Sequence, residues 1–282
     1  MPISFYEVIW IFLIYAFIGW CTEVSYAALD TGRFVNRGFL NGPVCPVYGC
    51  GVLLVVVVLT PLKENLLILF VGSVVLTTVI EFITGFLLEK LFHNQWWDYS
   101  NEPFNVCGYI CLKFSILWGL ACTFVMKIIH PMIYKVIHVF PNIPGMILMA
   151  VLLAVFACDL AITVSTILKF NKRLKTLEEM GRKIHRISDE IGENIYENVT
   201  AAVEKSEEWK DSISEKRAER RQEYEELSRK YKELLEQKNF GFKRLLKAFP
   251  DMRSREQNET LQKYKEHFNI KKWNSSKRKK EN

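Results

Sequence analysis

Apolar residues fill five stretches of the first 168 positions, and short polar loops separate them. These stretches are 5–29, 47–62, 66–88, 104–129 and 143–168. A helix rises 1.5 Å per residue, so roughly 20 apolar residues cross the hydrocarbon core of a bilayer. The second stretch is short and rich in valine, which would also suit a buried strand, but its place between longer stretches favours a helix. The pattern predicts an all-α polytopic membrane protein with about five transmembrane helices in a domain of residues 1–168.

The pattern changes at position 169, where a charged tail begins. Leu177, Met180, Ile184, Ile187 and Ile191 recur at helical spacing and form a narrow apolar seam. Such a seam is typical of a coiled coil or of packing on a partner helix. Charges then alternate up to residue 238, as on a solvated helix. Residues 169–238 are therefore expected to form a long, charged, partly coiled-coil-like cytoplasmic helix.

The last segment, 239–282, combines apolar and basic residues. Leucines and aromatics in 239–249 alternate with Lys243, Arg244 and Lys247, a pattern typical of a helix lying on anionic lipid. The ending 271–282 is strongly basic, and we expect it to be disordered. The sequence thus predicts a basic amphipathic segment followed by a disordered C-terminus.

Charge is divided unevenly between these parts, and this division predicts the orientation. Residues 1–168 carry seven Lys/Arg and nine Asp/Glu, whereas the tail carries the other 30 Lys/Arg and 22 Asp/Glu. Basic residues accumulate on the cytoplasmic side of membrane proteins. The tail and the loop with Arg33 and Arg37 then both face the cytoplasm. We expect a multi-pass protein of the cell membrane, with its N-terminus outside and its C-terminus cytoplasmic.

Two unusual loops fall on this predicted cytoplasmic face. The stretch 36–51, NRGFLNGPVCPVYGCG, is too rich in Gly and Pro to continue a helix. A bent or re-entrant entry to the second span would leave backbone N–H groups unpaired, and together with Asn36 and Arg37 these would attract an anion. The alternative is that Arg37 is an ordinary positive-inside residue and the prolines cap a helix. The second loop, 93–108, contains Trp97 and Asp98; paired tryptophans are typical of interfacial anchoring, but a carboxylate is not.

Charged residues also occur inside the predicted spans. Each costs about 2.5–3.5 kcal/mol at a helix centre, which makes isolated exposure to lipid unfavourable. We expect them to meet in a polar pocket open to the cytoplasm; the alternative is a closed ion-pair cluster that fixes helix packing. With the two loops, the candidate binding residues are Glu23, Asn36, Arg37, Glu81, Trp97, Asp98, Lys113 and Asp159.

Several chemistries have no support in the sequence. The seven cysteines lack paired metal-ligand spacing, so no metal site is expected. The chain contains no phosphate-binding GxxxxGK[ST] motif, and no G-x-S-x-G or H-E-x-x-H motif. No catalytic residue and no cofactor can be named, and the sequence favours a protein that is not an enzyme.

Four segments resemble a family of bacterial membrane proteins. They are FIGWCTEVSY, GRFVNRGFLNGPVCPVYGCG, IEFITGFLLEKLF and WWDYSNEPFNVCGYICLKFSILWG. These segments resemble the CmpB-like, type IV ABC-transporter family over roughly residues 5–125. The resemblance implies a polytopic permease-like protein without a known substrate. The absence of an ATP-binding motif fits a permease whose ATPase is a separate subunit, and it fits equally well a protein that is not part of an ABC transporter.

Three functions remain open at this point. The leading hypothesis is a transporter component that works as a homo-oligomer or with a separate ATPase. The second is an inner-leaflet enzyme that acts on a lipid or polyprenyl headgroup, with Arg37 holding a phosphate. The third is a scaffold or regulator whose tail helix binds a cytoplasmic partner. The bilayer is a partner in all three, and no nucleic acid is expected.

Overall fold

The computed structural model describes residues 4–139, 141–201, 207–237 and 240–270, with side chains described outside 193–217. The helices are α1 (Phe5–Thr31), α2 (Pro46–Leu59), η1 (Thr60–Leu62), α3 (Leu66–Phe92), α4 (Leu112–Phe124), the π-helical η2 (Val125–Ile129), α5 (His130–Val139), α6 (Asn142–Ala201), α7 (Glu207–Glu236), α8 (Phe240–Ala248) and α9 (Asn258–His267). The strands are β1 (Asn94–Gln95), β2 (Asn105–Val106), β3 (Ile110–Cys111) and β4 (Arg253–Ser254).

The apolar helices confirm an all-α membrane protein. Four segments in the described residues are long and apolar enough to cross a membrane: Phe5–Thr31, Leu66–Phe92, Leu112–Val139 and Asn142–Gly192. The shorter apolar helix Pro46–Leu62 stands between the first two. Its proline lies in the first turn, where the missing N–H costs no helical hydrogen bond.

Helices α1 and α2 cross closely because glycines stand at their contact. A Cβ added at Gly49 would lie 2.6 Å from the carbonyl oxygen of Phe12 and 3.0 Å from Cβ of Ala16. A Cβ at Gly19 would collide with the side chain of Tyr48. Small residues are what allow membrane helices to approach at backbone distance. This contact fixes the entry of α2 against the middle of α1.

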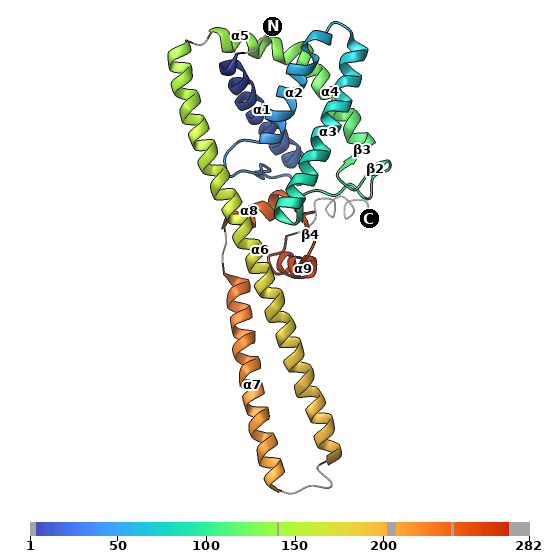
Figure 1. Cartoon of the computed structure of the whole chain (residues 1–282), viewed down its shortest axis with the longest axis vertical. Helices are drawn as coiled ribbons and strands as arrows, with labels where there is room; N and C mark the ends of the chain where they lie inside the picture. The colour runs from blue at the N-terminus through green and yellow to red at the C-terminus, as the bar shows by residue number, and fades with distance from the viewer. Residues whose placement is uncertain (1–3, 140, 202–206, 238–239, 271–282) are drawn as a thin grey trace.

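At the end of the bundle nearest the N-terminus, α5 turns across the other helices (Figure 1). Glu7 of α1 anchors α5: its Oε1 accepts a hydrogen bond from the Tyr134 hydroxyl at 3.0 Å and lies 2.8 Å from Nε2 of His138. The π-helical turn η2 stands where α4 passes into α5, and such turns are common where a helix bends.

The tail forms a hairpin. Helix α6 runs out of the opposite end of the bundle, which we call the tail face, and α7 returns alongside it (Figure 1). The seam residues Leu177 and Ile187 are buried, and Tyr231 of α7 packs against the buried cluster that includes Leu177. The partner of this seam is thus a helix of the same chain. The basic ending 271–282, which was expected to be disordered, lies outside the described residues.

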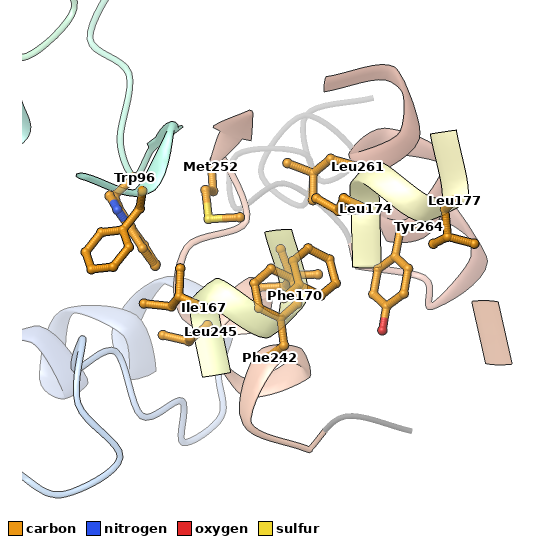
Figure 2. Packing of buried hydrophobic residues seen from close by; sticks show 12 residues of the cluster. Trp96, Ile167, Phe170, Leu174, Leu177, Phe242, Leu245, Met252, Leu261 and Tyr264 are labelled. Carbon is orange, nitrogen blue, oxygen red and sulfur yellow. The ribbon is translucent and has the colours of Figure 1, made fainter. Parts of the chain in front are cut away.

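After α7, the chain comes back to the tail face and packs on it as a cap, which we define as residues 240–270. Strand β4 of the cap pairs antiparallel with β1, with Asn94 opposite Ser254 and Gln95 opposite Arg253. A buried cluster joins the cap to α6 and to the loop after α3 (Figure 2). Its members include Trp96, Ile167, Phe170, Leu174, Leu177, Phe242, Leu245, Met252, Leu261 and Tyr264.

This cluster corrects two expectations. The apolar face of 239–249 does not lie on lipid, because Phe242, Leu245 and Leu246 are at most 1% exposed inside the protein. Trp96 is not an interfacial anchor either: it is 3% exposed and contacts Phe39 and Phe249 edge to face. Burial of a full leucine or aromatic side chain contributes about 1.5–3 kcal/mol, so protein contacts between the cap and the bundle satisfy this face better than partial contact with a headgroup region.

Candidate functional site

The glycine- and proline-rich loop places Arg37 against a carboxylate of α1. Nη1 of Arg37 lies 3.1 Å from Oε2 of Glu23, and about a quarter of each side chain is exposed. The Tyr48 hydroxyl from α2 donates a short hydrogen bond to the other oxygen of Glu23. Trp118 of α4 packs edge-on against the Tyr48 ring at 5.4 Å. Three helices and the loop therefore meet at Glu23.

Asn36 shapes the loop that carries Arg37. Its Oδ1 accepts hydrogen bonds from Nε1 of Trp20 at 2.8 Å and from the backbone N–H of Gly38 at 3.1 Å. Its Nδ2 donates to the carbonyl of Asn41 at 2.8 Å. All of these partners belong to the protein, so Asn36 holds the loop in place on α1.

Asp159 of α6 binds the same loop from the other side. It accepts hydrogen bonds from the backbone N–H groups of Asn41 (3.1 Å) and Gly42 (2.7 Å) and from Nδ2 of Asn41 (2.8 Å). The sequence predicted unpaired, anion-attracting N–H groups at the entry to the second span, and these two backbone donors lie a few residues before it. In the structure, these N–H groups donate to the carboxylate of Asp159, and a carboxylate is the kind of anion that a cluster of N–H groups favours.

Glu81 of α3 meets the second loop. The Tyr99 hydroxyl donates to Oε1 of Glu81 at 3.2 Å, and the Tyr99 ring stacks on Phe114 at 4.8 Å. Oε2 of Glu81 is buried without a hydrogen-bond partner among the described residues. Burial is the main factor that raises the pKa of Tyr99, followed by the Glu81 carboxylate, with a smaller contribution from Glu23. Tyr99 is thus a buried hydrogen-bond partner of Glu81.

Lys113 does not join these carboxylates. Its Nζ lies 3.5 Å from Oε2 of Glu102, and 64% of its side chain is exposed. It is the second residue of α4, directly after the β2–β3 hairpin, so its side chain reaches the surface rather than the bundle interior. The hairpin brings Glu102 to it, and hydropathy alone does not reveal that contact.

Trp97 and Asp98 stabilise the loop that carries Tyr99. Nε1 of Trp97 donates to the carbonyl of Tyr109 at 2.8 Å. Asp98 accepts from the backbone N–H of Ser100 at 2.9 Å and pairs with Arg253 of the cap at 2.9 Å. Asp98 therefore connects this loop to the cap.

Three arginines of the cap complete the region, and sequence reasoning did not single them out as site residues. Arg244 donates to the carbonyls of Gly38 (2.8 Å) and Phe39 (3.0 Å) and to Oδ1 of Asn41 (3.1 Å). Arg253 pairs with Asp98, and Arg255 pairs with Glu89. In a tail with 30 basic residues nothing in the local sequence marks these three, because only the return of the chain after α7 brings them to the tail face.

The chemistry of this region is that of carboxylates and tyrosines. No group of three or more His, Cys, Asp or Glu side chains that could hold a metal ion occurs among the described residues. Glu23, Arg37, Tyr48, Glu81 and Tyr99 form what we call the Glu23–Glu81 cluster. Its groups can bind a cation or a polar solute, or exchange a proton.

Comparisons with known proteins give the family. No curated protein matches the chain. No solved structure matches it either. A family model described as "Putative ABC-transporter type IV" matches residues 10–164, more than half of the chain, and the match covers α1 to α5 and the membrane part of α6. The chain therefore belongs to this type IV ABC-transporter family.

Proposed function

We propose that this protein is the permease-like membrane component of a transporter and that the Glu23–Glu81 cluster is its solute-binding site. The observation that carries the proposal is the contact of Tyr99 with Glu81, a carboxylate that receives this hydrogen bond on one oxygen only. Structural ion pairs normally use all of their buried oxygens, because an unsatisfied charged atom is costly. The buried Oε2 of Glu81 has no partner among the described residues, and a transported solute would supply one.

The orientation is part of the proposal, with the tail face in the cytoplasm and the N-terminus outside. Arg33, Arg37 and Lys90 lie near the tail face, whereas Lys63 and Lys135 flank the other end of the apolar helices. The α6–α7 hairpin would then extend into the cytoplasm, where a separate ATPase subunit or a second copy of the chain could bind it. Fusing a fluorescent protein to the C-terminus tests this: fluorescence in intact cells supports the orientation, and its absence from a membrane-inserted fusion contradicts it.

Transport is tested with purified protein in liposomes. The vesicles are incubated with a defined mixture of inorganic ions, amino acids, sugars and nucleosides, and their contents are measured by mass spectrometry. We expect the wild type to equilibrate at least one solute faster than protein-free vesicles, since downhill movement needs no ATP. Glu81→Gln removes the charge and should abolish this movement.

The matched control is Glu102→Gln, which changes a surface carboxylate paired with Lys113. We expect this variant to transport as the wild type does. Equal transport by Glu81→Gln and the wild type, with both variants folded by size-exclusion chromatography, would contradict the assignment of the site.

A further inference from the structure

A groove beside the Glu23–Glu81 cluster runs from the outer surface of α3 to the cap. Its volume is about 430 Å³, within the range of small-ligand sites. Phe82 and Phe86 of α3 line one end, and Arg253 of β4 and Arg255, which directly follows β4, line the other. We propose that this groove binds one anionic phospholipid, with the acyl chains along α3 and the phosphate at the arginines.

The apolar end of the groove opens toward the bilayer. Phe86 is 46% exposed, and Val79 and Ile83 beside it on α3 are each 48% exposed. Helix α3 is one of the helices long and apolar enough to cross a membrane. Residues exposed on such a helix are in contact with lipid chains, so a lipid reaches this end of the groove without leaving the bilayer.

The polar end lies at the boundary of the membrane part and carries fixed guanidinium groups. Arg255 pairs with Glu89, which also accepts a hydrogen bond from the Tyr109 hydroxyl at 2.5 Å. Arg253 pairs with Asp98 at 2.9 Å. Both carboxylates are buried, whereas the arginines are 48% and 68% exposed. A guanidinium has five N–H donors, so each arginine keeps donors that can face a phosphate after the ion pair forms.

Lys90 adds a cation that these carboxylates do not neutralise. It lies one turn after Phe86 on the same face of α3, with Nζ 5.8 Å from the centre of the Phe86 ring. Arg253 and Arg255 each have a carboxylate partner, whereas Lys90, which stands beside the groove and not in its lining, has none among the described residues. Glu256 is also outside the lining and is directed to His93, at 3.6 Å. A lysine beside an apolar face at this depth is the usual neighbour of a lipid phosphate.

The charge balance selects the occupant. A net positive groove with an apolar entrance favours a lipid with a net negative headgroup over a zwitterionic one. The apolar entrance also favours a lipid over a free anion, which gains nothing from Phe82 and Phe86. The inference concerns residues outside the proposed solute site, so it stands or falls independently of transport.

Native mass spectrometry of the delipidated full-length protein in neutral detergent tests the proposal. The probes are dioleoylphosphatidylglycerol, dioleoylphosphatidylcholine and inorganic phosphate. We expect one phosphatidylglycerol per chain to bind about fivefold more tightly than phosphatidylcholine, as one net basic residue near the headgroup predicts. Lys90→Gln should remove most of that preference. Lys63→Gln, at the other end of α3, is the matched control and should leave it unchanged.

The double variant Glu89→Gln/Arg255→Gln removes guanidinium donors, leaves no buried carboxylate unpaired and keeps the net charge of the groove. We therefore expect it to bind phosphatidylglycerol more weakly than the wild type does, whereas Lys90→Gln loses most of the preference. Four results would overturn the proposal. One is equal binding of the two lipids by the wild type. Another is displacement of phosphatidylglycerol by millimolar inorganic phosphate. The third is a wild-type preference in folded Lys90→Gln together with wild-type affinity in the folded double variant. The fourth is a lipid-free dimer that covers the groove.

Discussion

Arg244 donates a hydrogen bond of 2.8 Å to the carbonyl oxygen of Gly38, although 206 positions separate the two residues in the chain. Gly38 belongs to the loop that carries Arg37, and Arg244 belongs to the cap. The same guanidinium also bonds Phe39 and Asn41. Burial lowers the pKa of Arg244 while Asp159 opposes this shift, which leaves a charged donor among carbonyl acceptors. The cap therefore holds the loop next to Glu23 by way of one side chain.

We predict that Arg244→Ala destabilises the contact between cap and loop by about 1.5–3 kcal/mol, because it removes hydrogen bonds from a charged donor. Hydrogen exchange should become faster in residues 36–45 and in α8. Lys247→Ala is the control, since Lys247 is exposed on the same helix. Unchanged protection of the loop in Arg244→Ala would show that the cap core alone holds it.

The crossing of α1 and α2 gives a second prediction. Gly49→Ala should destabilise the protein by about 1–3 kcal/mol, because its Cβ would meet a backbone oxygen that cannot rotate away. Gly51→Ala, two residues further along α2, has open space around the added Cβ and should be neutral or stabilising by up to about 1 kcal/mol. Thermal unfolding in detergent measures the stability of both variants. Equal stability of the two variants would mean that α1 and α2 leave room for a methyl group at Gly49.

The sequence predicted the all-α membrane architecture, because hydropathy reports directly which segments suit lipid. Of the five predicted spans, four lie in helices of the described residues that are long enough to cross a membrane, and the second lies in the shorter helix Pro46–Leu62. The all-α architecture and the family follow from the apolar runs and from the NRGFLNGPVCPVYGCG and WWDYS segments. The same principle failed at 239–249. An amphipathic face has one pattern whether it meets lipid or protein, and only the return of α7 to the tail face brings Phe242 and Leu245 to α6.

The candidate site, too, could be predicted only in part. Arg37 and Glu23 were both named as candidate binding residues, and they form an ion pair in the structure. Lys113 was expected to pair inside the membrane, but it pairs with Glu102. Hydropathy places a residue along the membrane normal, but it does not give the direction in which the side chain leaves the helix. The cap arginines were missed because their partners lie more than 150 positions away in the chain.

Asp159 provides a third prediction. Asp159→Ala leaves the N–H groups of Asn41 and Gly42 without their acceptor and should cost about 1–3 kcal/mol. Asp159→Asn keeps one acceptor oxygen and should lie between this variant and the wild type. Thermal unfolding and hydrogen exchange at Asn41 and Gly42 check the order. Ile162→Ala, an exposed position on the same helix, is the control and should be close to neutral.

Tyr99 gives a prediction about pH. Burial and the neighbouring Glu81 raise its pKa above the ordinary value of 10.0. Above pH 10 the unfolded state loses this proton while the folded state keeps it. Tyr99 then contributes stability that is complete below pH 10 and falls by up to about 1.4 kcal/mol per pH unit above it. Unfolding in detergent between pH 8 and pH 11 should show this decline.

The variant Tyr99→Phe separates this effect from the other buried phenols. It lacks the hydrogen bond to Glu81, so we expect it to be about 1 kcal/mol less stable than the wild type at pH 8. It has no proton to lose, so its stability should fall less steeply above pH 10. A residual slope should remain, because burial also raises the pKa of Tyr109 and Tyr264. If the two curves stay parallel from pH 8 to pH 11, Tyr99 ionises as readily in the folded protein as in the unfolded chain, and its burial beside Glu81 is wrong.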